Sequence, residues 1–404
     1  MRRWLNRNVL GIGLADLAAD ANYEMVLSVL PLFITAGLGA PAFTVGLVEG
    51  VADGSSAAIK VWSGWYSDRI TWRKSLAAGG YGATGFGFAL LVAVASWPQV
   101  LVARAFAWVG RGLRQPIRSA MLAGSVDKKD IGKAFGFHEA MDTAGALIGP
   151  AIAFALLFTH HGFRTIFAVA IVPAVLTVVF FGLLTRDPRR GRPPAEAPDF
   201  KLPARFMRLL VPIGIFGVGN FATAFFTLRA AQMLRPELSA PAATAAAVGF
   251  YLAHNAVGTA VSFPAGWAAD HFGKAPVLAA AYATFALACV VGALGHGWFG
   301  VGLMALLVGA QEPVVPSVEG SLTGSLVEEA KHGTGYGVLN GVNGAGDLAS
   351  SVVAGVLWMA SPAVAMGFGF VLSVIASAIL WAWPGLSSPS SAAPTSASRP
   401  SSTA

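Results

Sequence analysis

The chain has 404 residues, of which 55% are hydrophobic and only 12% charged, and its mean hydropathy is +0.65. This composition excludes an ordinary soluble globular protein, in which about a quarter of the residues are charged. The net charge of +7 would suit a nucleic-acid-binding protein, but the basic residues collect in short segments between apolar runs, as they do in membrane proteins. A single cysteine, Cys289, excludes a disulfide framework.

Twelve apolar runs follow one another, each of about the 20 residues that a helix needs to cross a bilayer. We expect an all-α integral membrane protein with transmembrane helices at residues 9–35, 43–64, 75–95, 98–122, 133–158, 163–184, 207–232, 243–267, 275–294, 298–324, 335–359 and 363–383. The first run is expected to be an uncleaved span, because no convincing cleavage site follows the basic start.

The polar segments divide these spans into two halves. A basic, proline-rich linker at 185–206 would join an N-terminal six-helix bundle, 1–184, to a C-terminal one, 207–386. Residues 387–404 are rich in serine, proline and alanine, and we expect a disordered tail there. Basic residues lie mostly in the start and the even-numbered connections, which predicts a multi-pass protein of the cell (inner) membrane with both termini cytoplasmic.

The two halves repeat the same short motifs. A charged turn at 64–74 is matched at 266–274, where Gly266 stands 202 residues after Gly64. The segment 128–136 is matched by 329–337 at an offset of 201. Two related six-span halves favour a substrate site between the halves, near the middle of the membrane.

Three of these segments carry a family resemblance. The turn after the second span resembles motif A of the major facilitator superfamily at Gly64, Asp68, Arg69, Arg73 and Lys74, and Asp270 repeats its acidic position. The fourth span resembles motif B from Arg104 to Gly112, and the fifth resembles the antiporter motif C at Gly136, Gly145, Gly149 and Pro150. The resemblance covers nearly the whole chain and implies two pseudo-symmetric six-helix bundles and secondary transport, with motif C favouring antiport.

These motifs also have a physical interpretation. Glycines at 145 and 149 allow close helix packing, and Pro150 frees a backbone carbonyl and bends its span. Asp68 can accept hydrogen bonds from a neighbouring helix N-terminus, while the basic residues of the turn stay at the level of the lipid headgroups. The turn would then be a gate between the halves that breaks and reforms during transport.

Ionisable groups inside the spans are costly and usually face an interior pathway. In the N-terminal half they recur at helical spacing on four spans: Asp16, Asp20 and Glu24; Glu49, Asp53 and Lys60; Arg104, Arg111, Arg114 and Arg118; His138, Glu139 and Asp142. Topology places Glu24, Glu49 and Arg104 in the outer part, Asp20, Asp53 and Arg111 near the middle, and Asp16, Lys60, Arg118 and Asp142 nearer the cytoplasm. Opposite charges at matching depth predict ion pairs. A carboxylate without a permanent partner can carry protons. Our proton-coupling candidates are Asp20 and Asp53, then Glu24, with Glu49 and Asp142; the alternative is that these groups are structural pairs.

The C-terminal half has fewer charges and more amides. Together with Arg104, Arg111, Arg114, His138 and Glu139, the substrate-cavity candidates are Asn220, Arg229, His254, Asn255, Gln311, Glu312, Asn340 and Asn343. Glu319 and Asp347 lie on the same two spans as the last four. The run 311–313 ends in proline and resembles a broken helix that can bind a ligand. Phe221, Phe225, Phe226 and Tyr251 can line an apolar pocket, which favours a small organic solute.

We therefore expect a proton-coupled exporter working by antiport and alternating access, with lipid, protons and a small solute as partners, no nucleic acid and no cofactor, and a monomeric state. One alternative is a proton-coupled importer. Another is a metal-ion carrier using His138 with Met141 and Asp142, since histidine and carboxylate ligands bind metals. The run His138–Asp142 lacks the second histidine of a helical zinc-protease motif, and no phosphate-binding loop indicates coupling to ATP.

Overall fold

The computed structural model describes residues 4–67, 72–127, 130–187, 202–328 and 331–383, and every regular element within these ranges is helical. The elements are α1 (Arg7–Leu32) with a π-helical extension η1 (Phe33–Gly37), α2 (Ala42–Ser67), α3 (Arg73–Leu90), α4 (Trp97–Ala123), α5 (Ile131–Phe158), α6 (Phe163–Leu184), α7 (Ala204–Gly219), α8 (Ala224–Leu234), α9 (Ala240–Phe272), α10 (Lys274–Leu294), α11 (Gly297–Gln311), α12 (Val314–Leu326), α13 (His332–Ala360) and α14 (Pro362–Trp381).

Each of the twelve predicted spans corresponds to one of these helices or to two consecutive ones, which confirms the predicted fold class. Two spans are interrupted. The seventh consists of α7 and α8, separated at residues 220–223, and the tenth consists of α11 and α12, separated at residues 312–313. Pro313 explains the second interruption, because proline has no backbone N–H to continue the helical hydrogen bonds.

Seven segments of the described chain are long and apolar enough to cross a membrane by themselves, including the interrupted spans taken whole. The other five are α2, α3, α4, α9 and α13. Of these, α2 and α4 carry the acidic and arginine residues that lower their hydropathy, and they pack closely against each other within the protein. Burial of the polar faces of α2 and α4 inside the bundle makes these less hydrophobic helices compatible with a bilayer.

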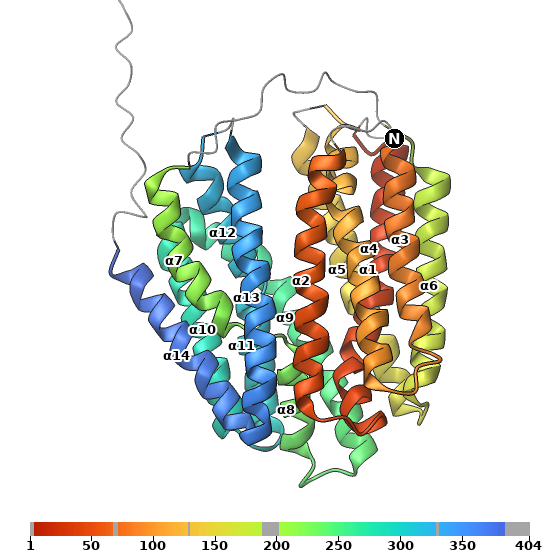
Figure 1. Cartoon of the computed structure of the whole chain (residues 1–404), viewed down its shortest axis with the longest axis vertical. Coiled ribbons are helices and arrows are strands. Elements are labelled where there is room, and N and C mark those ends of the chain that lie inside the picture. The colour runs from red at the N-terminus through yellow and green to blue at the C-terminus, as the bar shows by residue number, and fades with distance from the viewer. Residues whose placement is uncertain (1–3, 68–71, 128–129, 188–201, 329–330, 384–404) are drawn as a thin grey trace, which may run out of the picture.

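Figure 1 shows α1–α6 (red to yellow-green) beside the helices of the second half (green to blue). We call the end of the molecule at which α2 and α6 end and α3 and α7 begin the linker face, and the opposite end, which carries the α1–α2 and α13–α14 connections, the far face (Figure 1). Most of the predicted linker (188–201) and all of the predicted tail (387–404) lie outside the described residues.

The two bundles touch through α2 with α13, α5 with α9, and α1 with α8. Glycine permits the closest approach: a side chain at Gly46 of α2 would collide with the backbone carbonyl of Ser351 on α13. Gly46 lies within the first turns of α2, which begins at the far face. Gly249 near the start of α9 similarly faces Phe154 near the end of α5. These contacts therefore join the bundles in the half of the molecule toward the far face.

The motif C residues pack α5 onto α1 within the N-terminal bundle. A side chain at Gly149 would collide with the carbonyl oxygen of Ala21, and one at Gly145 with that of Leu17. Close packing of this kind is what small residues provide between membrane helices. Gly136 lies outside this contact and has open space around it. Pro150 stands in the interior of α5, so the carbonyl of Ala146 has no helical N–H partner at that position.

Candidate functional site

A cavity of about 480 Å³ lies between the two bundles. Its wall is formed by residues of α1, α2 and α4 of one bundle and of α7–α13 of the other, together with the interruptions at 220–223 and at Glu312. A second cavity of about 670 Å³ at the far face has Arg235 as its single charged lining residue. The first cavity holds the polar groups, and we take it as the candidate functional site.

The wall contributed by the N-terminal bundle contains an ion pair. Arg104 Nη2 donates to Glu49 Oε2 at 2.6 Å, and both side chains are buried. The Arg104 guanidinium lies 3.2 Å from the centroid of the Trp108 ring, within the range of a cation–π interaction. Arg111, two turns further along α4, donates to the Tyr23 hydroxyl at 3.3 Å. The two arginines of this wall are thus held by aromatic rings and by one carboxylate.

Two other carboxylates of the same wall are held by uncharged donors. Asp53 Oδ1 accepts from Trp108 Nε1 at 2.7 Å. Glu24 Oε2 accepts from the hydroxyl of Tyr251 at 2.7 Å, and Tyr251 belongs to α9 of the other bundle. Loss of the negative charge on an ion-paired carboxylate would leave its arginine without a counter-charge, whereas carboxylates with neutral donors have no such partner. On this wall, Asp53 and Glu24 are the two carboxylates whose hydrogen-bond donors in the described chain are uncharged.

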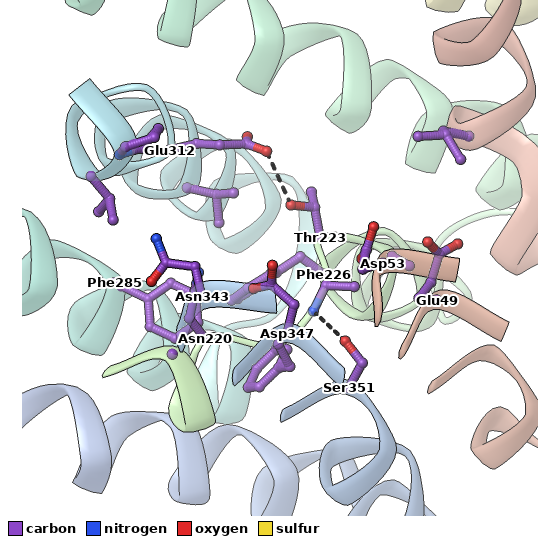
Figure 2. A pocket seen from close by; sticks show the side chains of 18 of the residues that line it. Glu49, Asp53, Asn220, Thr223, Phe226, Phe285, Glu312, Asn343, Asp347 and Ser351 are labelled. Carbon is purple, nitrogen blue, oxygen red and sulfur yellow. Dashed lines mark hydrogen bonds between the residues drawn. The ribbon is translucent and has the colours of Figure 1, made fainter. Parts of the chain in front are cut away.

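The wall contributed by the C-terminal bundle is rich in acceptors. Glu319 accepts from the Tyr282 hydroxyl at 2.7 Å and from Asn343 Nδ2 at 2.8 Å. Glu312 lies 3.2 Å from His254 Nδ1 and accepts from the Thr223 hydroxyl at 3.5 Å. Figure 2 shows Asn343 and Asp347 on this side, with Asp53 and Glu49 across the cavity from them.

The interruption between α7 and α8 brings further groups into this wall. Asn220, Phe221, Ala222 and Thr223 all line the cavity. Ser351 of α13 accepts a hydrogen bond from the backbone N–H of Ala222 at 3.3 Å, which is drawn in Figure 2. Because the helix is interrupted here, side chains of these consecutive residues face the cavity together, which a continuous helix would not allow.

Aromatic rings complete the C-terminal wall. Phe221 and Phe226 stack with their centroids 5.3 Å apart, and both rings pack against Phe285. Phe216 lies beside Phe285 and also lines the cavity. Of the aromatic set that the sequence indicated, Phe221, Phe226 and Tyr251 line the cavity, whereas Phe225 packs against Trp358.

Four candidates occupy a second polar cluster buried inside the N-terminal bundle. Its centre is Asp16, whose Oδ1 accepts from Arg118 at 2.7 Å, from Arg114 at 3.4 Å and from the Tyr81 hydroxyl at 2.6 Å. His138 Nε2 lies 3.0 Å from Asp16 Oδ2, and Asp142 lies 3.9 Å from His138. Asp20 is buried with Asp142 and Arg111 among its charged neighbours. Asp20, Arg114, His138 and Asp142 are not among the residues that line the cavity.

The remaining candidates are dispersed. Glu139 and Asn340 are exposed, and neither is among the residues that line the cavity. Arg229 donates to the carbonyls of Gly292 and Ala293 and so caps the C-terminal end of α10. Asn255 bridges the bundles by donating to Ala146 O at 3.0 Å. Gln311 lines the cavity.

The predicted gating loop is only partly described. Asp68 and Arg69 lie outside the described residues, and Gly64 lies in the last turn of α2. The backbone N–H of Lys74 donates to Asp187 at 2.7 Å, and its ammonium donates to Gly182 O at the same distance. Arg73 stands beside Lys74 at the start of α3, and Asp270 is exposed near the end of α9.

Asp16, His138 and Asp142 place one ligand atom each within 4.8 Å of one another, a spacing that a metal ion could bridge. Two arginines already neutralise Asp16, and their charge opposes a divalent cation at that point. Met141 packs against α1 at Gly13. This cluster therefore fits a structural ion-pair network better than a metal centre.

Sequence reasoning missed several residues of these sites, among them Tyr23, Trp108 and Tyr282. A signal existed for two of them. Trp108 follows Arg104 by four residues and therefore shares its helix face. Tyr282 follows Tyr81 by 201 residues, the offset of the internal repeat. No such spacing indicates Tyr23. Its ring reaches the cavity from the side of α1, beside Glu24.

A profile of the Major Facilitator Superfamily matches residues 12–252. The chain belongs to the major facilitator superfamily. It is 28% identical, over 94% of its length and 95% of the relative's, to an uncharacterised MFS-type transporter of Methanocaldococcus jannaschii. A protein of Mycobacterium tuberculosis is 31% identical over 60% of this chain and 65% of its own length.

Solved structures agree with the superfamily fold. The nucleoside transporter NupG superposes with a TM-score of 0.75, 11% identity, and coverage of 94% of this chain and 98% of that one. A bacterial homologue of the lysosomal transporter Spinster, solved in an inward-facing conformation, gives a TM-score of 0.69 at 14% identity, with 96% of each chain covered. The chain is thus a multi-pass membrane transporter of this superfamily.

Proposed function

We propose that the protein exchanges protons for a small organic solute by alternating access, and that the cavity between its bundles is the solute site. The observation that supports this is the placement of Glu24 and Asp53: both line the cavity, and both accept hydrogen bonds from uncharged donors. Carboxylates so placed can take up and release protons within reach of a bound solute. Asp20 is buried outside the cavity, so it would act on Glu24 and Asp53 only through its own charge.

The contacts between the bundles indicate how a proton would bias the conformation. Glu24 and Tyr251 join α1 to α9, and Asn255 joins α9 to the carbonyl of Ala146 that Pro150 leaves without a helical partner. Both hydrogen bonds would break if the bundles separated toward the far face. A proton on Glu24 weakens its bond to Tyr251, because a charged acceptor binds a hydroxyl more strongly than a neutral one. Protonation would thereby favour the state that is open to the far face.

Membrane orientation gives this exchange a direction. The basic connections lie at the linker face, so the positive-inside rule makes that face cytoplasmic. The contacts between the bundles are toward the far face, and the described state would then be open to the cytoplasm. Protons arriving from outside would reach Glu24 when the far half opens, as the solute leaves. The protonated carrier would then return to the state open to the linker face and release its proton to the cytoplasm, which closes the cycle as export by antiport, the mode that the resemblance to motif C also favours.

The test is transport in proteoliposomes with an imposed pH gradient and a pooled set of labelled small organic solutes. We expect Glu24→Gln and Asp53→Asn to lose gradient-driven flux while solute counterflow, which needs no net proton movement, continues. Glu237→Gln, which changes an exposed carboxylate between α8 and α9, is the matched control. Release of protons on the side where solute is added would support antiport. Uptake of protons together with solute would instead indicate symport and contradict antiport. Equal gradient dependence in all variants would contradict proton coupling by these residues.

A further inference from the structure

The C-terminal wall of the cavity contains acceptors of hydrogen bonds without an accompanying cation. Six carboxylates line the whole cavity, and two arginines, Arg104 and Arg111, are the cationic side chains among its described lining residues. Both arginines belong to the N-terminal wall. The acidic excess is therefore concentrated on the opposite side, at Glu312, Glu319 and Asp347.

The partners of these three groups are mostly neutral. Glu319 is held by a tyrosine hydroxyl and an asparagine amide. Glu312 is paired with the imidazole of His254. No side chain in the described part of the chain forms an ion pair with Asp347 within 4.0 Å, and Lys60 of α2 acts on it from a greater distance. A cationic partner would stabilise a half-buried carboxylate of this kind.

Gln311 supplies an independent indication of a ligand. Its side chain is 5% exposed and lines the cavity, yet its Oε1 accepts no hydrogen bond in the described structure. A buried polar atom without a partner is costly unless something else satisfies it. Like the three carboxylates, this oxygen requires a donor. The wall thus presents four acceptor groups to whatever occupies the cavity.

The phenylalanines around these acceptors restrict the ligand further. Phe221, Phe226 and Phe285 form a contiguous aromatic surface on the same wall. Such a surface binds an apolar body, and aromatic rings also attract a cation placed over them. An ammonium group carries three donors, no acceptor and one positive charge, which matches the acceptors.

We infer that the solute is an organic amine that enters as a cation, with its ammonium group between Glu319, Asp347 and Gln311 and its apolar part on the phenylalanines. This inference rests on the proposed function, because it names the class of solute for the same cavity. The wall with Arg104 and Arg111 then faces the remainder of the solute. Glu24 and Asp53 on that wall remain available to carry protons.

Binding to the purified full-length chain tests the inference without any gradient. The probes are charge-matched sets on two aromatic bodies: 2-phenylethylamine, 2-phenylethanol and 3-phenylpropionate, and tryptamine, tryptophol and indole-3-propionate. Calorimetric titration should show the amines binding roughly tenfold or more tightly than the alcohols and acids, as one charge-assisted contact would give. Glu319→Gln should remove that preference, and Glu237→Gln should keep it.

Asp347→Asn provides a second variant should Glu319→Gln fail to fold, and it should reduce the same preference. A preference for the acids or alcohols, equal binding of all three charge forms, or no binding of any probe would overturn the inference. The two proposals fail in different ways. Amine binding without gradient-driven flux would support the amine site and contradict proton coupling. Proton-driven flux of an organic acid would support proton coupling and contradict the amine site.

Discussion

Tyr81 of α3 and Tyr282 of α10 stand 201 residues apart, and each donates its hydroxyl to a buried carboxylate. The carboxylate is Asp16 in the N-terminal bundle and Glu319 in the C-terminal bundle. Around Asp16 the other partners are two arginines and a histidine. Around Glu319 the other partner is Asn343. The same tyrosine therefore belongs to a closed ion-pair cluster in one half and to an acceptor site on the cavity wall in the other.

The internal repeat shows how this difference arises. Counting 201 residues onward, Arg118 becomes Glu319, Asp142 becomes Asn343 and Asp16 becomes Gly217. Exchanging the aspartate for glycine removes the charge that would neutralise a cation on the tenth span. Gly217 lines the cavity, and a side chain there would meet the backbone of Gly346 on α13. On our proposals, the two related bundles use one framework for two purposes, stability in one and binding in the other.

This comparison predicts its largest effect at Asp16. Asp16→Asn leaves Arg114 and Arg118 buried without a counter-charge, which should lower the free energy of unfolding by about 3 to 5 kcal/mol. Glu319→Gln should cost about 1 kcal/mol or less, because the amide oxygen can still accept from Tyr282. Thermal unfolding of the two purified variants in the same detergent measures the difference.

A double variant controls for this interpretation. Asp16→Asn combined with Arg118→Gln should recover part of the lost stability, because the second change removes one of the unpaired charges. Equal melting temperatures for Asp16→Asn and Glu319→Gln would show that the two clusters do not differ as their partners indicate.

The second prediction concerns the contact that joins the halves. Tyr251→Phe removes the hydroxyl that donates to Glu24, a bond to a charged group worth about 1.5 to 3 kcal/mol. The population in which the far half is closed should fall by roughly tenfold or more relative to the open one. Labelling by a maleimide at Thr35→Cys, in the cavity at the far face, should therefore become faster. Cys289→Ser supplies the background, since Cys289 is the single native cysteine.

Ser377→Ala is the control for Tyr251→Phe. The Ser377 hydroxyl donates to Ala279 O at 2.8 Å between α14 and α10 of the C-terminal bundle, so this change removes a buried hydroxyl within one half. Labelling at position 35 should keep its original rate. Faster labelling in both variants would mean that the bundles loosen generally and that the contact of Glu24 with Tyr251 has no particular role.

Sequence patterns predicted the twelve spans because each needs about 20 apolar residues, a local property. They also grouped opposite charges by depth, and the structure shows Glu49 bonded to Arg104 and Asp16 to Arg118. For the middle group, no ion pair within 4.0 Å joins Arg111 to Asp20 or Asp53 in the described residues. The patterns did not separate Asp16 from Glu24. A spacing of four residues overshoots one helical turn by about 40°, so eight residues rotate the direction by about 80°. Asp16 consequently points into the bundle and Glu24 points to the cavity.

Other features depend on tertiary contacts that no local pattern reveals. Arg229 was expected in the cavity, but it bonds to the end of α10, a neighbour in space rather than in sequence. The interruption at 220–223 contains no proline, so only the structure shows that Asn220 and Thr223 face the cavity together. The proline at 313, by contrast, did indicate a broken helix.

The smallest expected effect belongs to Asn255, and it links motif C to the contact between the halves. Asn255→Ala removes the hydrogen bond to Ala146 O at 3.0 Å, worth about 1 kcal/mol, and a long one to Glu24 at 3.5 Å, and should raise maleimide labelling at position 35 by about fivefold. Pro150→Ala gives the carbonyl of Ala146 a helical N–H partner, so the hydrogen bond from Asn255 then contributes less to the contact between the halves. The double variant should then label less quickly than the product of the two single effects predicts. Strict additivity would mean that the carbonyl freed by Pro150 does not depend on Asn255, and that the proline acts only by shaping α5.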